Sequence, residues 1–406
     1  MRIHRATGLV LLIAVVVAVG HAQSSDSAGP LEDFDFVWRA ISEWYVEPDY
    51  GGVGWDAIHD DYRLRVQRAS DQDGAYNVIG EMLAELGNTT TFVIPPALVP
   101  ALRQQAEQQG PAEQEYAGVG ILIAETDGPG VAVLGTFREA PAEKAGVLLG
   151  DVLVGVNGYR FTDDDDTQAV TNRVRGPVGS DVTLTLRDPD GVERQVTITR
   201  GRIDLRPSVE TRVVQRTIGY IRVPSLSMDL IQQVSRALPS LLSTQGIVLD
   251  LRGVPGGSPD AMAVLAQWFL GPTPIGAVVT REERHAIPYS PDAIAAYRGH
   301  LVVLTDSRTS GVAEVLAAAL RDAGRSRIVG TVTRGGSQIA SIVEMPSGGL
   351  LQIAIANYTT ARGTVLRDKG ITPDIELVPP DLATLRAGRD PHLDRAIEVI
   401  RSGGRI

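Results

Sequence analysis

The chain has 406 residues, which predicts two or three domains of typical size, and its 43% hydrophobic and 21% charged residues are typical of a folded globular protein. Its net charge of -11 argues against nucleic acid as a partner, because binding to phosphate needs a basic face. The absence of cysteine excludes disulfides, thiolate metal sites and a cysteine nucleophile. No metal or organic cofactor site is visible in the sequence.

Residues 1–22 are predicted to be a signal peptide. They begin with basic residues, continue with an apolar run over 8–19 and end in small residues that suit cleavage after Ala22. The run is short for a permanent membrane helix, although an uncleaved anchor stays open. We therefore expect an exported protein, periplasmic or extracellular, that contacts a membrane only if this segment is retained. Residues 23–30 form a polar leader.

Residues 31–115 are predicted to be a helical region with a linker. Apolar side chains recur at three- and four-residue steps over 31–45, 55–68 and 74–86, which predicts a small all-helical unit. The glutamine-rich stretch 102–114 is polar and predicts a helical or loose linker.

Residues 116–202 read as β-rich. Strands are predicted at 119–123, 131–134, 182–187 and 193–199, and a short helix near 167–174. Four aspartates, Asp163 to Asp166, precede that helix. We interpret them as a solvated loop with a helix N-cap at its end, in preference to a metal site.

From residue 203 to 378, strands alternate with helices, which predicts a layered α/β core. The predicted strands are 218–223, 247–251, 301–304, 327–332, 339–344 and 350–357, the last two completing the sheet, and the predicted helices are 230–241, 260–269 and 312–323. Segment 247–251 is apolar except for Asp250, as expected for a buried strand of a mainly parallel sheet. A closing helix is predicted at 391–400, within the C-terminal segment 379–406.

Three stretches together resemble the carboxyl-terminal processing peptidase family, the tail-specific serine peptidases of family S41. The first comprises residues 116–121, 140–146 and 150–158 and is similar to the PDZ domain of that family. The resemblance implies peptide binding at Gly118, Val119, Gly120 and Ile121. Glycines there let successive N–H groups converge on a terminal carboxylate while the peptide adds a strand to the sheet edge. A tight turn without a ligand is the alternative.

The second stretch, 250–257, reads DLRGVPGG and resembles the family's DLRNNPGG. The resemblance implies that the backbone N–H groups of Gly256 and Gly257 help to form an oxyanion hole, for which glycine allows close approach. Gly253 and Val254 replace the two asparagines. The alternative is a strand-to-helix turn that needs glycine for packing.

The third stretch should carry the chemistry, and it departs from the family pattern. The family's nucleophilic serine lies three residues before a glutamate at the start of a helix, which is Glu314 here, so the serine position falls on Gly311. The general-base lysine falls on Gly336. The glutamine that steadies the lysine falls on Ala340, or on Gln338 if two residues are lost.

A serine needs a base, and a lysine serves only if its pKa is lowered by burial. Ser310 could take the place of the nucleophile only through a one-residue insertion. Without it, the Ser310 side chain points about 100° round the helix from the direction that the nucleophile needs. The two lysines, Lys144 and Lys369, lie outside the base position. Arg334 cannot deprotonate, and a lone histidine such as His285 or His300 is usually structural.

A further departure lies at the end of the helical region. Where relatives often show an aspartate–histidine pair, this chain has Asn88 and Thr89.

The resemblance implies a multidomain α+β protein with an N-terminal helical unit, a PDZ domain and a layered α/β core of the ClpP/crotonase-like type. We expect a pseudopeptidase that binds unstructured polypeptide C-termini through the PDZ domain and a vestigial substrate channel. Two alternatives stay open: an active serine-type endopeptidase that uses Ser310 with an unrecognised base, and a structural partner of an active relative. A homo-oligomer is a further open expectation.

Overall fold

The computed structural model describes residues 29–108 and 115–403. The predicted signal peptide and nearly all of the leader lie outside the described residues. The chain divides into two compact units, of which the first holds residues 29–108, 209–376 and 400–403 and the second holds residues 115–208 and 377–399. None of the described helices has the length and apolar character needed to cross a membrane.

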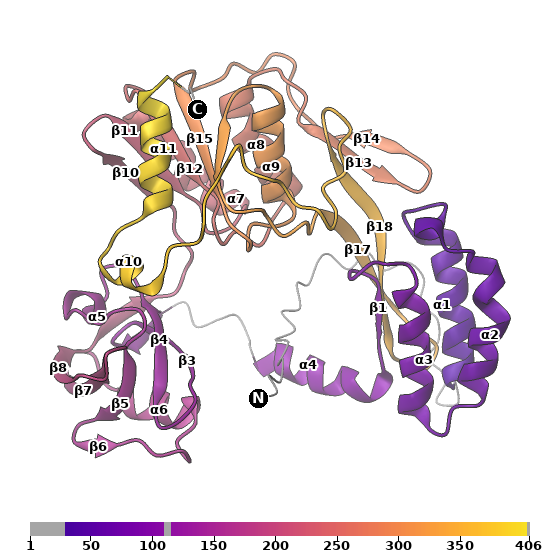
Figure 1. The fold of residues 1–406 in the computed structure, drawn as a ribbon, viewed down its shortest axis with the longest axis horizontal. Coiled ribbons are helices and arrows are strands. Elements are labelled where there is room, and N and C mark those ends of the chain that lie inside the picture. The colour runs from indigo at the N-terminus through magenta and orange to yellow at the C-terminus, as the bar shows by residue number, and fades with distance from the viewer. Residues whose placement is uncertain (1–28, 109–114, 404–406) are drawn as a thin grey trace. The chain divides into compact units, whose positions relative to one another are not determined.

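A six-stranded, mainly parallel sheet forms the centre of the first unit (Figure 1). In spatial order its strands are β10 (Glu210–Val214), β11 (Ile218–Arg222), β12 (Gly246–Asp250), β15 (His300–Thr305), β16 (Arg327–Gly330) and β19 (Ile375–Glu376). Only the β10–β11 pair is antiparallel. The prediction of a buried parallel strand near 247–251 is confirmed, since every residue of β12 is buried.

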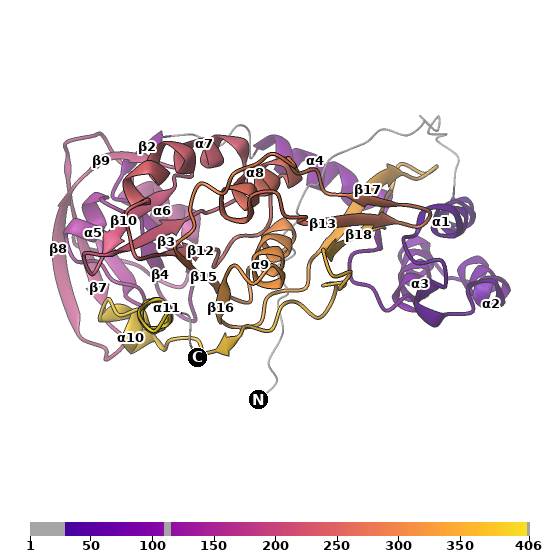
Figure 2. The ribbon, with the colours of Figure 1, turned by 90° about the horizontal axis from the view of Figure 1, so that it is seen from above.

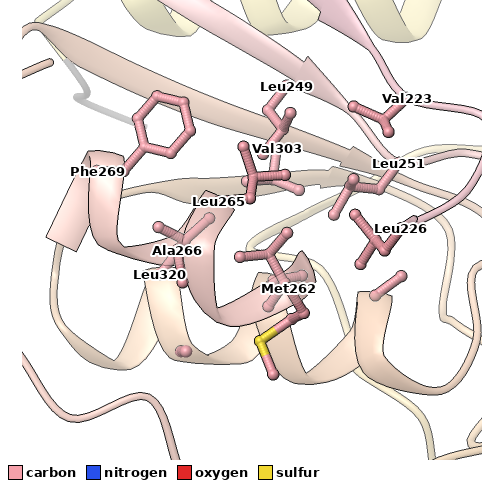
Figure 3. Close-up of a cluster of buried hydrophobic side chains, with 14 of the residues drawn as sticks. Val223, Leu226, Leu249, Leu251, Met262, Leu265, Ala266, Phe269, Val303 and Leu320 are labelled. Atoms are coloured by element: carbon pink, nitrogen blue, oxygen red, sulfur yellow. The ribbon is translucent and has the colours of Figure 1, made fainter. Parts of the chain in front are cut away.

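Helices pack on this sheet through their apolar faces. They are α7 (Met228–Ala237), which continues into the 3-10 turn η3 (Leu238–Leu241), α8 (Pro259–Leu270) and α9 (Val312–Asp322). Figure 3 shows Leu249 and Val303 of neighbouring strands in one cluster with Leu265 and Phe269 of α8. Full burial of such a side chain contributes about 1.5–3 kcal/mol. Every residue of α9 from Val312 to Leu320 is buried, so the start of this helix is firmly held.

A second sheet of five strands corrects the prediction that segments 339–344 and 350–357 complete the first sheet. Its strands are β1 (Phe92–Ile94), β13 (Gly276–Thr280), β14 (Arg284–Ala286), β17 (Gln338–Glu344) and β18 (Leu350–Thr360). A tight turn over 345–349 makes β17 and β18 an antiparallel hairpin, and β18 also pairs with β1 and β13. The turn pairs the two strands with each other, which the order of strands along the chain could not show.

The predicted N-terminal helices are present, and they pack on this hairpin. They are α1 (Pro30–Trp44), the 3-10 turn η1 (Tyr50–Gly52), α2 (Trp55–Gln67), α3 (Gln72–Ala84), the 3-10 turn η2 (Pro96–Leu98) and α4 (Val99–Gln108). Strand β18 lies beside α1 (Figure 2). Leu351 and Ile353 of β18 belong to the same apolar cluster as α1–α3. The buried Asp33 carboxylate accepts hydrogen bonds from the Tyr76 hydroxyl (2.6 Å) and the Ser347 N–H (3.0 Å). Helices and hairpin therefore share one core.

The second unit is built on an antiparallel sheet with strand order β3-β4-β5-β7-β8, to which β6 adds beside β5, and on the separate pair β2–β9. The strands are β2 (Glu115–Gly118), β3 (Ile121–Glu125), β4 (Val131–Thr136), β5 (Val152–Val156), β6 (Tyr159–Arg160), β7 (Asp181–Arg187), β8 (Glu193–Thr199) and β9 (Gly201–Asp204), and the helices are α5 (Pro141–Lys144) and α6 (Thr167–Val174). The acidic run ends as predicted in an N-cap, since Asp166 accepts the Ala169 N–H at 2.7 Å.

The chain after the core returns to this second unit. It forms α10 (Leu382–Arg386) and α11 (Pro391–Arg401). Arg386 donates hydrogen bonds to the Leu149 carbonyl (2.7 Å) and to the buried Asp151 carboxylate (3.0 Å). Residues 377–399 are thus part of the β-rich unit. From the sequence, residues 379–406 had been predicted as a C-terminal helical segment distinct from the PDZ domain.

Candidate functional site

Two loops meet at the carboxyl ends of the neighbouring parallel strands β12 and β15. The Asp306 carboxylate follows β15 and accepts hydrogen bonds from the N–H groups of Gly253 (2.8 Å) and Thr309 (2.9 Å). Burial pushes the pKa of Asp306 upward, but these donors outweigh burial and the net pKa is lowered. An ionised Asp306 therefore fixes the 250–257 loop against the start of α9. Sequence reasoning missed Asp306, although polar residues at the carboxyl ends of parallel strands often serve a site.

Gly256 and Gly257 are held by the backbone of Leu226. The Leu226 N–H donates to the Gly256 carbonyl (3.1 Å), and the Leu226 carbonyl accepts from the Ser258 N–H (2.7 Å). This is parallel pairing, which turns the N–H of Gly257 away from Leu226. A Cβ at Gly257 would lie 2.2 Å from the Leu226 carbonyl oxygen, so only glycine fits. Among the described residues, neither glycine amide donates a hydrogen bond.

The predicted nucleophile position, Gly311, is the N-cap of α9 and faces the glycine pair. Its backbone has φ +60° and ψ -132°, and its N–H donates to the Glu314 carboxylate at 3.0 Å. A Cβ at this position would meet the Gly256 Cα at 3.6 Å and the Gly336 carbonyl oxygen at 3.7 Å, which are ordinary contacts. The structure therefore brings together Gly256, Gly311 and Gly336, which lie far apart in the sequence.

The predicted base position, Gly336, lies directly against Ser310. A Cβ at Gly336 would be 2.2 Å from the Ser310 Oγ, so the serine hydroxyl occupies the space where a side chain at 336 would begin. Ser310 itself is 7% exposed, and its N–H donates to the Val254 carbonyl at 2.9 Å. Its hydroxyl thus points at position 336.

Glu314 fastens the segment around Gly336 to the helix. Its buried carboxylate accepts hydrogen bonds from the Thr333 hydroxyl (2.5 Å) and the Gly335 N–H (2.7 Å) as well as from Gly311. Burial raises the pKa of Glu314, and these donors oppose that rise. The sequence marked Glu314 only as a landmark of the motif, whereas the structure gives it a positioning role.

Within the part of the chain that the structure describes, no lysine or histidine is hydrogen-bonded to Ser310. His300 begins β15 while Ser310 follows its far end, so the strand alone separates them by about 17 Å. His285 lies on the edge strand β14 and contacts the Glu283 carboxylate at 3.0 Å. Lys369 is exposed, although its neighbours Asp368 and Gly370 pack on Gly335.

Gln338 connects this region to the N-terminal helices. Its Oε1 accepts from the Asn88 amide (3.0 Å), and its Nε2 donates to the Asn357 side chain (2.9 Å). The same Asn88 amide also donates to the Tyr45 hydroxyl at 3.2 Å. Asn88 is therefore one member of a chain of hydrogen bonds that reaches β17 and β18.

The second unit has a free strand edge beside a helix. Its β3 strand lies at the edge of the sheet and pairs only with β4 among the described strands, and α6 packs beside β3. Gly120 has φ +78°, and a Cβ there would lie 2.5 Å from the Ala140 Cβ, so the turn before β3 needs glycine. Ile121 and Ile123 of β3 and Val174 of α6 are only partly buried. A free strand edge beside a helix is a geometry that accepts an added peptide strand.

Comparisons with known proteins match both units. Residues 217–377 match the model of peptidase family S41, residues 27–84 that of the tricorn protease C1 domain, and residues 138–188 that of the PDZ domain. A carboxyl-terminal-processing protease of Picosynechococcus is 30% identical over 382 residues, which cover 91% of this chain and 89% of that protein. Carboxyl-terminal-processing peptidase 3 of Arabidopsis thaliana is 28% identical over 365 residues, 84% of this chain and 67% of that protein.

A solved structure agrees with these relatives. The photosystem II D1 C-terminal processing protease matches with a TM-score of 0.53 and 26% identity over 89% of this chain and 97% of that chain. The expected fold, an N-terminal helical region with a PDZ domain and an S41 core, is confirmed. The chain belongs to the carboxyl-terminal processing proteases of the serine peptidase family S41.

Proposed function

We propose that this family member binds polypeptide C-termini without cleaving them. The observation that carries this proposal is the pair of glycines at 311 and 336, together with the Ser310 hydroxyl in the space of a side chain at 336. A glycine offers neither a hydroxyl nucleophile nor an amine base. Removing one member of a serine–base pair leaves only the contribution of binding and of the oxyanion hole. Residual activity at that level would not make this chain a working peptidase.

Binding is assigned to the free edge of β3 and the neighbouring helix α6 of the PDZ domain. The free edge of β3 supplies backbone hydrogen-bonding groups, and the turn at Gly118–Ile121 supplies N–H groups for a terminal carboxylate. The partly buried Ile121 and Val174 offer an apolar wall for the last side chain of the peptide. We therefore expect ligands with a free carboxyl terminus and an apolar final residue.

The catalytic half of the proposal is tested with an unstructured polypeptide that ends in apolar residues. We expect mass spectrometry to find no cleavage by the wild type, by Ser310→Ala or by Lys369→Ala. Ser337→Ala removes a neighbouring buried hydroxyl that has no hydrogen-bond partner and is the matched control. Cleavage that disappears in Ser310→Ala but persists in Ser337→Ala would revive the active-enzyme alternative, and loss in Lys369→Ala would identify the base.

The binding half is tested by the affinity of the whole protein for one peptide in two forms, with a free and with an amidated carboxyl terminus. We expect the free form to bind at least tenfold more tightly, because a charge-assisted hydrogen bond is about twice as strong as a neutral one and the site is built for an anion. Equal affinity of the two forms would contradict recognition of chain ends.

We also propose export from the cytoplasm, supported by the basic start, the apolar run and the small residues before position 23. N-terminal sequencing of the protein purified from an extracytoplasmic fraction checks this proposal. A chain that starts at Gln23 supports cleavage, and an intact N-terminus in a membrane fraction supports an anchor.

A further inference from the structure

Helix α6 runs antiparallel to the free strand β3. The Arg200 Nε donates to the Val174 carbonyl, at the last residue of the helix, at 2.8 Å. The next residue, Gly201, pairs with Gly118, which opens the turn that is proposed to receive a peptide carboxylate. Helix α6 also contacts β3, and an eight-residue helix of about 12 Å is similar in length to a five-residue strand of about 17 Å. The residues before α6 therefore lie toward the far end of β3.

An arginine lies at the start of this strand. Arg175 follows the last residue of α6, is exposed, and places its guanidinium carbon 5.4 Å from the centre of the Tyr116 ring. That ring lies over Gly118, since a Cβ built there would be 2.4 Å from the ring Cε2. Within the described part of the chain, Arg175 has no ion-pair partner. A guanidinium in this position suits the carboxylate that ends a peptide.

Carboxylates gather toward the opposite end of the strand. Glu125 is the last residue of β3, Asp127 lies in the turn that follows, and both are exposed. Asp163 and Asp164 precede α6 and are exposed as well. Among the residues that the structure describes, none of these four carboxylates takes part in a hydrogen bond or an ion pair. They come from both elements that border the free edge.

The rest of the acidic run before α6 is used by the fold itself. Asp165 accepts a hydrogen bond from the Tyr159 hydroxyl at 3.0 Å, and Arg173 stacks on the ring of that tyrosine at 3.8 Å. Asp166 caps the helix by accepting the Ala169 N–H at 2.7 Å. The negative charge that is left for a ligand is therefore that of the four unpaired carboxylates.

The position of the carboxylate turn fixes the direction and register of a bound peptide. A peptide that pairs with β3 and ends at the start of the strand must run antiparallel to it. Side chains alternate along a strand, so Glu125 shares a face with Ile121 and Ile123, which pack against the core of this unit. If the last residue of the peptide lies opposite Ile121, the fifth residue from its end lies opposite Glu125. Opposite charges at such a directly facing pair attract.

We propose that the PDZ domain selects polypeptide tails that end in an apolar residue and carry lysine or arginine at the fifth to seventh residues from the end. This inference rests on the proposed peptide-binding function and names the chemistry of its partner. Arg175 pairs with the terminal carboxylate, and the four carboxylates pair with the basic side chains upstream. A tail with acidic residues upstream brings like charges together and is rejected.

The test measures the affinity of the whole protein for fluorescein-labelled peptides that share an apolar last residue. They differ only at the fifth and sixth residues from the end, which are two lysines, two glutamines or two glutamates. We expect the lysine peptide to bind about threefold to tenfold more tightly than the glutamine peptide, and the glutamate peptide to bind more weakly by a similar factor. These differences should shrink in about 1 M salt, which screens exposed charges.

Removing the carboxylates tests their assignment. The triple variant Glu125→Gln, Asp163→Asn and Asp164→Asn should bind all three peptides alike and keep the wild-type affinity for the glutamine peptide. The matched control is Asp190→Asn, which removes an exposed carboxylate between β7 and β8 at the opposite edge of the sheet. This control should keep the preference for lysine. The peptide series on the wild type gives a result even if the triple variant does not fold.

Arg175→Gln tests the other end of the strand. We expect it to weaken binding of the free-carboxylate peptides about threefold to tenfold and to leave amidated peptides unchanged. Arg187→Gln, at the end of β7, is its control and should change neither affinity.

The outcomes separate this inference from the function on which it rests. Equal affinity for the three peptides, or tighter binding of the glutamate peptide, would overturn the selection of basic tails. If free and amidated ends are still distinguished in that case, the peptide-binding function stands. A lysine preference that persists in the triple variant would overturn the assignment to these carboxylates, and unchanged binding in Arg175→Gln would overturn the pairing with that residue. No binding of any peptide would overturn the peptide-binding function and this inference together.

Discussion

Replacing Gly336 by alanine tests whether the Ser310 hydroxyl fills the path of a side chain at 336. Gly336 is not among the glycines with positive φ, so its backbone tolerates alanine. The new Cβ, however, would lie 2.2 Å from the Oγ and 3.6 Å from the Cβ of Ser310. Because Ser310 is almost fully buried, its hydroxyl must leave its rotamer or push its neighbours, which costs about 1–3 kcal/mol.

The same change should be harmless once the hydroxyl is gone. In a Ser310→Ala background the nearest atom is the alanine Cβ at 3.6 Å, an ordinary contact. Gly336→Ala then stabilises the protein by about 0.4–1 kcal/mol, since it reduces the entropy of the unfolded chain. A double-mutant cycle should therefore give a coupling energy of about 1–3 kcal/mol between positions 310 and 336.

Urea unfolding followed by tryptophan fluorescence measures the stabilities needed for this cycle in the first unit, which contains both substituted positions. The four tryptophans, Trp38, Trp44, Trp55 and Trp268, all belong to the first unit, as do both substituted positions. Coupling below about 0.5 kcal/mol, the limit for independent sites, would refute the reasoning, because it would mean that the hydroxyl leaves room for a side chain at 336.

Two further predictions concern stability. Gly257→Ala should lower the free energy of unfolding by about 3 kcal/mol or more, since φ is +146° and the new Cβ would lie 2.2 Å from the Leu226 carbonyl oxygen. Gly253→Ala, whose new Cβ would have no neighbour closer than 3.7 Å, should lower it by only about 1–2 kcal/mol. Equal losses of stability in urea unfolding would contradict this prediction. Burial raises the pKa of Asp151, but the hydrogen bonds that its carboxylate accepts, first of all from Arg194, outweigh burial, and the net pKa is lowered. The ionised carboxylate therefore stabilises the folded protein at any pH above the pKa of Asp151 in the unfolded chain. This stabilisation is lost as the pH falls through the lower pKa of Asp151 in the folded protein. The protection of residues 116–202 against hydrogen exchange, taken relative to the intrinsic exchange rate at each pH, should therefore fall below about pH 4 in the wild type. Asp151→Asn should show less protection at pH 7 and a weaker dependence of that protection on pH, and an unchanged pH profile of protection in this variant would count against the assignment.

Patterns within single segments predicted most elements of the fold. Strand β12 could be predicted because Ile247, Val248 and Leu249 form an apolar run of strand length, and α9 because its apolar residues have helical spacing. Strand β14 was missed because it has only three residues, all of them exposed, and the five-residue strand β13 with which it pairs was missed as well. The sheet to which β17 and β18 belong depends on the turn between them and on the N-terminal helices, which no local pattern contains.

The candidate site, like the fold, could be predicted only in part from local sequence patterns. The motifs predicted that Gly311 and Gly336 occupy two key positions, and the structure places them against each other and against Gly256. What the motifs could not contain is the direction of a side chain. The contact of the Ser310 hydroxyl with Gly336, the hydrogen bonds to Asp306 and the cover that Tyr116 forms over Gly118 all join residues that are distant in sequence or depend on a rotamer.

The contact between Ser310 and Gly336 also constrains how this lineage can change. A lysine at 336 would place its Cβ 2.2 Å from the Ser310 hydroxyl oxygen. A serine at 311 would have no lysine to accept its proton until the substitution at 336 is also present. Each of these substitutions alone is therefore either harmful or without benefit, and their order matters, because Ser310→Ala first removes the hydroxyl that a side chain at 336 would meet. Such sign-dependent epistasis means that the residue at 310 decides whether a side chain at 336 is tolerated.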